Sequence, residues 1–357
     1  MDIKKASFLV WRTIGVCVAS IACATLSQAS VVSNPPGLNY SRLVDLEALR
    51  TTIWIVNTVY PQHEPTGEAE YLSSFNELRN QIVNSGGRFE SSTQMWISGD
   101  ALPTQSDSSK AERFFNFSIH RLSGDGAADQ KTLNKEVGPG AISLPSVKSS
   151  EYVIANRTSL STEWTSPFIP RNTYQDKFVG AQRTSSVPFM HRDGSLTYIS
   201  DADGLHIKLG LKGGLSLIVR QSTKPDVGKF DVNRLLEKTL TPVLTNAHFV
   251  NAHLALPKFE AANNGESDLG LINSHGGALG LPSLNSARPP IIIMQFSRVN
   301  FSEFGLSTHT LTLAARTRVL TKPAPPVTVK IDRPFEFCIV DDATRTPLYF
   351  GHVSNIN

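Results

Sequence analysis

VKIDRPFEFCIVDDATRTPLYFGHVSNIN, residues 329–357, is the part of this sequence that says most about the fold. Branched and aromatic side chains dominate two runs, within 327–340 and 346–353, and polar and turn-forming residues separate them. Short apolar runs bounded by turn residues are typical of buried strands. The end of the chain is therefore predicted to contribute strands to a core.

Working outward from this stretch, the pattern changes from helical to strand-like along the chain. Residues 41–60 and 67–84 carry apolar side chains at helical spacing, and most later segments alternate or run apolar between Gly, Pro and Asp turns. Short later helices are expected only at 231–240 and 266–273. Helices first and many strands afterwards predict an α+β fold with large antiparallel sheets, as one domain over 38–357.

The N-terminus has the pattern of a secretory signal peptide. Basic residues precede an apolar run at 13–26, and small residues follow at 27–29. The run is shorter than the roughly 20 residues that a membrane helix needs. We therefore expect a signal peptide at 1–29, a Pro/Gly linker at 30–37, a secreted protein and no membrane anchor.

The charge of the chain bears on its partners, and its cysteine content bears on disulfides. Removing the signal takes away three of 34 basic and one of 31 acidic residues, which leaves a net charge of about +1 and gives no reason to expect nucleic acid as a partner. Cys338 is then the one remaining cysteine, so no internal disulfide is possible. It lies in an apolar strand pattern and is expected to be a buried, unreactive thiol.

Motifs for catalysis are missing from the sequence. It contains no HExxH, no histidine pair joined to a cysteine pair, no GxSxG, no phosphate loop and no GxGxxG. His248 and His253 are five residues apart in an alternating strand, where opposite faces are expected. The interpretation is a protein that is not an enzyme and has no metal and no cofactor.

Three separated motifs resemble the serpin family. The C-terminal stretch matches the family's Arg-Pro-Phe turn at 333–335 and its closing Gly-x-Val-x-Asn at 351–355, and Pro-Lys-Phe recurs at 257–259. The third motif is a spacing of polar and aromatic residues at Asn156, Trp164, Phe168, Thr173 and Phe178. The resemblance runs from about Asn39 to the last residue. It implies a serpin-like fold of large mixed, mostly antiparallel sheets, with N-terminal helices packed on them and an exposed reactive-centre loop, and without the family's first helix.

The resemblance also implies a buried polar cluster, the shutter, under the sheet that moves in this family. The family's histidine there falls at Gln295, its usual partner Asn156 is retained, and a Ser-Pro-x-x-Ser pattern keeps only Ser41. Glutamine both donates and accepts hydrogen bonds, so the pair with Asn156 can be re-formed. Asn156 lies in a glycosylation sequon but is expected to be structural.

Three other sequons are taken as candidate glycosylation sites. They are at Asn39, Asn116 and Asn300. Sequons inside strands are usually unoccupied.

The resemblance identifies residues 303–326 as the reactive-centre loop, which members of the family offer to a serine protease and then insert into the large sheet. Glu303 and Gly305 match the hinge where insertion starts. An inserted strand would then point one set of side chains inward, and none of these is charged: Leu306, Thr308, Thr310 and Thr312.

The scissile bond is placed by counting from Glu303. The family's usual distance gives Val319-Leu320, and one residue fewer gives Arg318-Val319. We favour Arg318-Val319, because arginine suits the carboxylate-lined pocket of a trypsin-like protease, with Arg316-Thr317 as the alternative. The alternative without this role is that Arg316, Arg318 and Lys322 form a solvated basic loop.

Two functions follow from the resemblance. The first is a secreted, monomeric inhibitor of a trypsin-like serine protease that works by loop insertion. The second is a non-inhibitory serpin-fold protein with a substrate-like, carrier or storage role. Leu306, His309 and Leu311 favour the second, because they are bulkier than the small residues of inhibitory members and would slow insertion.

Overall fold

The computed structural model describes residues 41–59, 68–97, 112, 116–137, 152–202, 204–223, 236–266, 291–307 and 326–356. The expected signal peptide, linker, Asn39 and the region of the family's first helix lie outside the described residues. So do Thr308, Thr310, Thr312 and the candidate scissile-bond residues Arg316, Thr317, Arg318, Val319 and Leu320. Within the described part, none of the helices has the length and apolarity that crossing a membrane requires.

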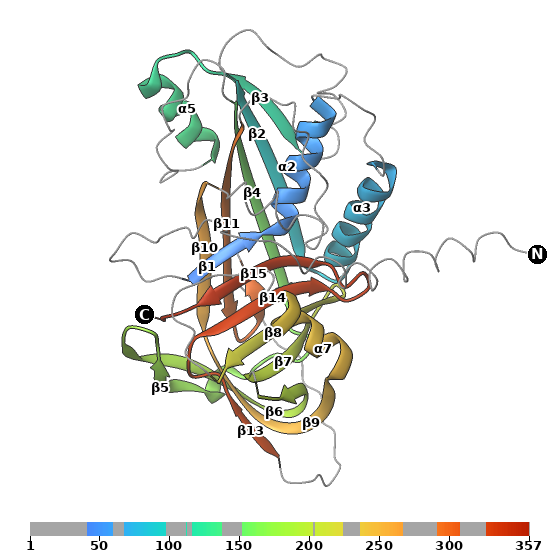
Figure 1. The fold of residues 1–357 in the computed structure, drawn as a ribbon, viewed down its shortest axis with the longest axis vertical. Helices are drawn as coiled ribbons and strands as arrows, with labels where there is room; N and C mark the ends of the chain where they lie inside the picture. The colour runs from blue at the N-terminus through green and yellow to red at the C-terminus, as the bar shows by residue number, and fades with distance from the viewer. Residues whose placement is uncertain are drawn as a thin grey trace, which may run out of the picture. The chain divides into compact units, whose positions relative to one another are not determined.

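The helices are few and mostly near the start of the described chain (Figure 1). Their bounds are α2 Leu46–Val59, α3 Glu68–Asn84, α5 Gly126–Val137 and α7 Thr241–Asn246, with short helical turns η3 Pro170–Asn172 and η4 Leu236–Leu240. α2 packs on strands of the sheet, as expected for an N-terminal helix. The predicted helix at 67–84 is confirmed, whereas α5 was not predicted.

The predicted helix at 41–60 is wrong over its first five residues. Ser41–Asp45 forms strand β1, which pairs with the C-terminal strand from Ser41 opposite Val353 to Asp45 opposite Tyr349. The helix begins after Asp45, whose Oδ1 accepts the N–H of Ala48 at 2.8 Å. An aspartate cap of this kind satisfies an otherwise unpaired N–H of the first helical turn and fixes where the helix starts.

Strands make up most of the rest, in a mixed and mostly antiparallel arrangement that confirms the predicted fold class. In chain order they are β2 Arg88–Ile97, β3 Phe117–Arg121, β4 Tyr152–Glu163, β5 Thr173–Val179, β6 Thr184–Ser200, β7 Gly204–Leu211, β8 Leu215–Ser222, β9 His248–Pro257, β10 Phe259–Glu266, β11 Ile291–Ser302, β12 Gly305–Ser307, β13 Val327–Lys330, β14 Phe335–Asp341 and β15 Pro347–Val353. Glu266 ends β10, so the helix expected from 266 does not include it, and the rest of that segment is outside the described residues.

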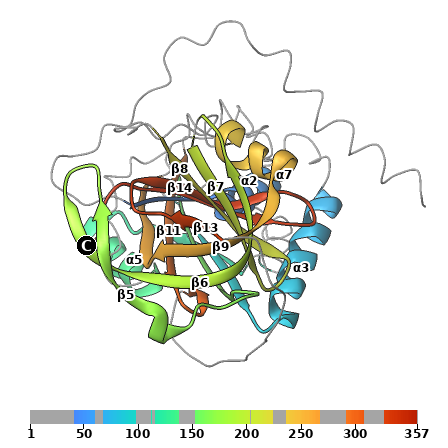
Figure 2. The same ribbon diagram turned by 90° about the horizontal axis from the view of Figure 1, so that it is seen from below.

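Two groups of strands matter for the site. β10, β11, β4 and β2 run side by side with α2 packed against them (Figure 1). Seen from below, β5, β6 and β9 follow one another in a second, curved group (Figure 2). β14 and β15 connect the two, since β14 pairs with β8 and β15 pairs with β1.

A cluster of buried phenylalanines fixes this connection. The ring of Phe259 on β10 lies 4.7 Å from that of Phe301 on β11, 5.0 Å from that of Phe335 and 5.3 Å from that of Phe337, the last two on β14. Truncating one such buried ring to alanine typically costs about 3–5 kcal/mol. The C-terminal stretch therefore holds the long strands against the second group.

Candidate functional site

The candidate site lies where two neighbouring strands separate. β4 and β11 pair in parallel along a line we call the seam, from Ile291 opposite Tyr152 to Ser297 opposite Thr158. Beyond Ser297 the strands part into a fork, and β12, the start of the predicted hinge, lies between them and pairs with both. A short segment is thus already inserted at the open end of the seam.

Leu306 is the side chain that fills the fork. It pairs with Phe301 of β11 and Thr162 of β4, and only 1 % of its surface is exposed. Directly opposed residues of adjacent strands point to the same face, and Phe301 is fully buried. Leu306 therefore faces the buried side of the sheet.

Gly305 occupies a position that no larger residue fits. Its φ is +139°, and a Cβ there would lie 2.3 Å from the carbonyl oxygen of Thr162 and 2.6 Å from the Cα of Glu163. Both are backbone atoms of β4 and cannot rotate away. Glycine is thus what allows the hinge to approach β4 so closely.

Glu303 anchors the hinge. Its Oε1 accepts hydrogen bonds from Lys258 Nζ at 2.7 Å and Thr173 Oγ1 at 2.8 Å, and its carbonyl accepts the N–H of Phe168 at 3.0 Å. Burial alone would raise the pKa of Glu303, but the hydrogen bond from Lys258, a backbone hydrogen bond, the hydrogen bond from Thr173 and the charge of Lys258 together lower the pKa below its usual range. The carboxylate is therefore held ionised.

Trp164 closes the same corner. Its indole Nε1 donates to the carbonyl of Ser302 at 2.7 Å, and its N–H donates to the carbonyl of Phe304 at 3.0 Å. Its ring lies 5.8 Å from the rings of both Phe168 and Phe301. Residues of two separated sequence motifs and of the hinge thus meet at one point of the sheet.

A buried carboxylate lies under the closed part of the seam. Asp45 is fully buried, and its Oδ2 accepts hydrogen bonds from Ser297 Oγ on β11 at 2.6 Å and from Thr158 Oγ1 on β4. The side chain of Gln295, also on β11, donates to the carbonyl of Asp45 at 2.7 Å. We call Asp45, Thr158, Ser297 and Gln295 the Asp45 cluster.

The electrostatics of the Asp45 cluster are the reverse of those at Glu303. Burial raises the pKa of Asp45 to about 6, although the hydrogen bonds from Ser297, Thr158 and Ala48 oppose the shift. Tyr349 donates to Thr158 Oγ1 at 3.0 Å, and burial together with the charge of Asp45 raises the pKa of its phenol well above the usual value. A negative charge here is costly for the fold.

The predicted shutter residues lie at this cluster or beside it. Gln295 and Asn156 are opposite each other across the seam, and both are buried. The amide of Asn156 donates to Thr93 Oγ1 at 2.7 Å, while its buried Oδ1 has no hydrogen-bond partner among the described residues. Ser41 is the first residue of β1, opposite Val353, and its side chain is outside the described residues.

Asp45 itself was missed by the sequence analysis. The available signal was an acidic residue just before Leu46 in a helical pattern, which marks a helix cap. Its distant partners on β4 and β11 gave no local signal.

Of the remaining predicted residues that the structure describes, Asn300 of β11 pairs with Ser307 at the fork, whereas Asn116 lies just before β3 and Cys338 lies on β14. Asn116 and Asn300 are exposed, and Asn116 has a positive φ of 48°. Cys338 is buried, and burial raises the pKa of its thiol far above the usual value. Among the described residues, no three His, Cys, Asp or Glu side chains are grouped so that they could hold a metal ion.

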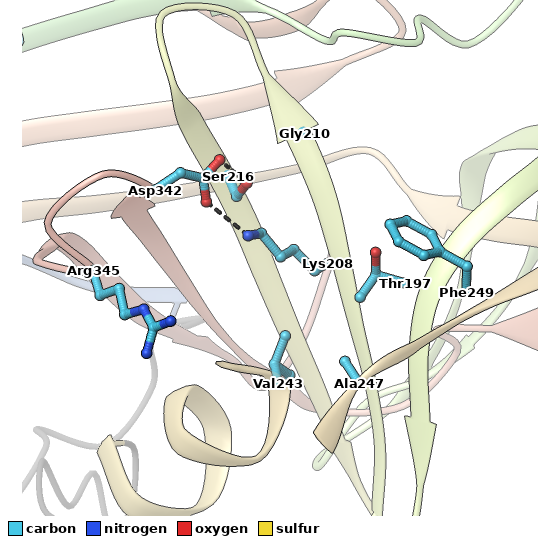
Figure 3. Close-up of a pocket in the computed structure, with 9 residues that line it drawn as sticks. All are labelled: Thr197, Lys208, Gly210, Ser216, Val243, Ala247, Phe249, Asp342 and Arg345. Carbon is cyan, nitrogen blue, oxygen red and sulfur yellow. Dashed lines mark hydrogen bonds and ion pairs between the residues drawn. The ribbon is translucent and has the colours of Figure 1, made fainter. Parts of the chain in front are cut away.

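A separate hollow of about 430 Å³ lies between β7, β8 and α7 (Figure 3). Asp342 lines this hollow, where its carboxylate forms a 2.7 Å ion pair with Lys208 and accepts a 2.8 Å hydrogen bond from Ser216. These polar groups therefore satisfy one another. Phe249 lies at its border with 78 % of its surface exposed. Among the predicted site residues that the structure describes, none lines this hollow.

Known proteins share this architecture. The family model Serpin, serine protease inhibitor, matches residues 60–274. Alpha-1-antiproteinase F of Cavia porcellus is 24 % identical over 315 residues, covering 83 % of this chain and 72 % of that protein, and alpha-1-antitrypsin 1-4 of Mus musculus is 24 % identical over 320 residues, covering 81 % and 73 %.

Solved structures agree on the fold. A serpin from Schistosoma mansoni superposes with a TM-score of 0.67 at 16 % identity, covering 89 % of this chain and 96 % of that one. Human thyroxine-binding globulin complexed with its ligand superposes with a TM-score of 0.66 at 13 % identity, covering 88 % and 92 %. At these identities the likeness is one of fold.

Proposed function

Because the chain belongs to the serpin family of serine protease inhibitors, we propose that it is a secreted, monomeric inhibitor of a trypsin-like serine protease that inserts its loop between β4 and β11. The observation that carries the proposal is the hinge. Gly305 and Leu306 already pair with both strands of the fork, so a continuing strand would next enter the seam, where β4 and β11 now pair with each other and would have to separate.

The register of that path fits the inward residues of the loop. Extending the pairing of β12 would place Thr310 between Ser297 and Thr158, two residues that now lie opposite each other. An inserted Thr310 would therefore point its hydroxyl toward the Asp45 carboxylate. Threonine suits a strand and brings no charge into the sheet.

The next inward residue meets a second acceptor. By the same register, Thr312 would lie between Gln295 and Asn156. The Oδ1 of Asn156 is buried and has no partner among the described residues, and leaving such an atom unpaired typically costs about 1–3 kcal/mol. A threonine hydroxyl placed there would donate the missing hydrogen bond.

Insertion would be driven by many small gains. Each new ladder hydrogen bond contributes about 1 kcal/mol net, and the strand gains partners on both sides at once. About a dozen such bonds exceed the lower part of the 5–15 kcal/mol that stabilises a typical domain. This energy would hold a covalently attached protease in its trapped position.

The target class follows from the proposed scissile bond. We place it at Arg318-Val319, with Arg316-Thr317 and Val319-Leu320 as alternatives, and an arginine side chain selects a pocket with a buried carboxylate. A signal peptide at 1–29 would deliver the protein to the extracellular space. Asn116 and Asn300 are exposed and so accessible to glycosylation.

Trypsin is the test protease for this proposal. Mixed with the protein lacking its signal peptide, it should give a complex that survives SDS and contains both chains. Arg318→Ala should lose the complex and Arg316→Ala should keep it. Cleavage of the loop with full recovery of trypsin activity would contradict inhibition.

The second candidate is a non-inhibitory protein whose loop is cleaved as an ordinary substrate. Bulky side chains at the start of the loop favour this candidate, because they would slow insertion. Leu306 is already buried in the fork, so His309 and Leu311 are the bulky side chains that would oppose insertion. A cleaved protein whose melting temperature equals that of the intact protein would support this candidate. A large rise on cleavage would exclude it, because the rise requires an inserted strand.

A further inference from the structure

The closed seam contains one feature that insertion by itself does not explain, a carboxylate without a counter-ion among the described residues. Asp45 makes no ion pair within the described part of the chain, and its hydrogen bonds come from an N–H and two hydroxyls. A buried acid without a cationic partner is costly, because hydrogen bonds replace only part of its lost hydration.

We propose that Asp45 stores free energy in the closed seam and releases it when the loop enters, so that its buried charge speeds insertion. This inference rests on the proposed loop insertion and concerns how that same step is controlled. Asp45 would act as a positioning and energetic residue for insertion, without contacting the protease.

The position of the carboxylate supports this role. Thr158 and Ser297, its two hydroxyl partners, sit on the two strands that must part, and their oxygen atoms are 3.4 Å from each other. The pair lies three residues along β11 from Asn300, which already pairs with Ser307 of the hinge. The buried charge is therefore directly ahead of the inserted segment.

Insertion improves the surroundings of this charge in two ways. When β4 and β11 separate, water gains access to a carboxylate that is now fully buried. When the sheet closes again on the new strand, Thr310 would add a hydroxyl donor between Thr158 and Ser297. Both changes favour the ionised acid over the closed seam that holds it now.

The charged groups near Asp45 that the structure describes do not neutralise its carboxylate. From α2, Glu47 and Arg50 are paired with each other at 2.8 Å, and the charge of Glu47 disfavours ionisation of Asp45. From β15, Tyr349 contributes only a phenol that is neutral at physiological pH. The nearest charged residues on the seam strands are Arg157 of β4 and Arg298 of β11, which are exposed and thus on the opposite face.

The charge appears within the physiological pH range. Since the pKa of Asp45 is raised to about 6, the residue is mostly protonated at pH 5 and ionised at pH 8. Insertion should accordingly be slower at pH 5, where the stored energy is absent. Asp45→Asn keeps the shape and the helix-capping ability but stays neutral, so it should behave like the low-pH form at every pH.

The experiment compares complex formation by the wild type and Asp45→Asn with trypsin between pH 5 and 8. At each pH, the ratio of trapped to cleaved protein for the wild type is divided by the same ratio for Asp45→Asn. This division cancels the pH dependence of trypsin itself. We expect the trapped-to-cleaved ratio of the wild type to exceed that of Asp45→Asn by at least about threefold at pH 8, and the two ratios to be equal at pH 5. The largest possible effect is about a hundredfold, because the pKa of Asp45 is raised from 3.8 to about 6. Asp341→Asn, a change in a buried acid outside the seam, should follow the wild type.

A ratio that does not change with pH, or a faster Asp45→Asn at pH 8, would overturn the inference. Thermal unfolding of the uncleaved proteins separates it from the proposed function. The melting temperature of the wild type should fall relative to Asp45→Asn as pH rises from 4 to 7, whether or not the loop inserts. If the melting temperatures of the two proteins change with pH in the same way, the buried charge is refuted. If they differ as expected but no trypsin complex forms, the proposed function is refuted and there is no insertion for Asp45 to speed.

Discussion

Gly305 offers a direct test of the hinge geometry. In the structure its φ of +139° disfavours any L-residue, and a Cβ would lie within 3 Å of three backbone atoms of β4 and the residue after it, including the carbonyl oxygen of Thr162 at 2.3 Å. Gly305→Ala therefore combines a conformational cost with a steric one. Because the clashing atoms are backbone, the hinge must move away from β4 to relieve the contact.

Gly194 on β6 provides a matched control. Its φ of +138° is almost the same, but no atom lies within 4 Å of the position that a Cβ would take. Holding a non-glycine residue in a sparsely populated backbone region costs about 1–3 kcal/mol, which both substitutions should share. Leu306 would also lose much of its burial if the hinge moved, which is worth about 1.5–3 kcal/mol.

The expected free-energy losses are thus about 1–3 kcal/mol for Gly194→Ala and about 2.5–6 kcal/mol for Gly305→Ala. Urea unfolding of both variants and the wild type measures the difference directly. In the trypsin assay, Gly305→Ala should yield cleaved protein where the wild type yields complex. Equal losses for the two variants would show that the hinge is not held between β11 and β4 in solution, and the reasoning about the fork would fail.

Three further predictions test the surroundings. Glu303→Gln should lose about 1–3 kcal/mol of stability at pH 7, because Lys258 keeps its charge and loses its partner. Since the pKa of Glu303 is lowered in the folded protein, the stability advantage of the wild type is complete above the usual glutamate pKa and disappears as pH falls through the folded pKa. Unfolding both proteins at pH 7 and pH 3 measures this difference. Cys338 should be inert to a thiol reagent in the native protein and react fully once unfolded, and rapid native labelling would contradict its burial. Arg318→Ala should reduce the rate of complex formation with trypsin by at least about a hundredfold, and an equal loss with Arg316→Ala instead would move the scissile bond.

Local patterns were enough to predict the elements whose side chains alternate or run apolar. The stretches that became β14 and β15 pack on both sides, so their residues are nearly all apolar and their identity as strands is visible in sequence. The hinge was predicted from the resemblance to serpins alone, and the structure shows that its two marker residues have narrow requirements, an acid for Lys258 at Glu303 and a residue without a Cβ beside β4 at Gly305.

Elements determined by distant partners could not be read in this way. Residues 41–45 continue a helical spacing of leucines, and they form a strand only because β15 lies beside them from the far end of the chain. α5 is mostly polar, with too few apolar residues to show a helical period. Asp45 gains its importance from Thr158 and Ser297, which are 113 and 252 residues away along the chain.

The two buried acids of the site have opposite electrostatic settings, and this would give the proposed insertion a direction. Glu303, at the entrance, has a cation at 2.7 Å that lowers its pKa, so movements that pull the hinge out of the fork separate an ion pair. Asp45, further along the seam, has hydroxyl and amide partners but no cation among the described residues, and its pKa is raised, so movements that open the seam ahead of the hinge would relieve a buried charge. A strand advancing from the fork keeps the first contact and relieves the second. In the proposed insertion, outward movement would therefore be resisted at Glu303, and inward movement would be favoured at Asp45.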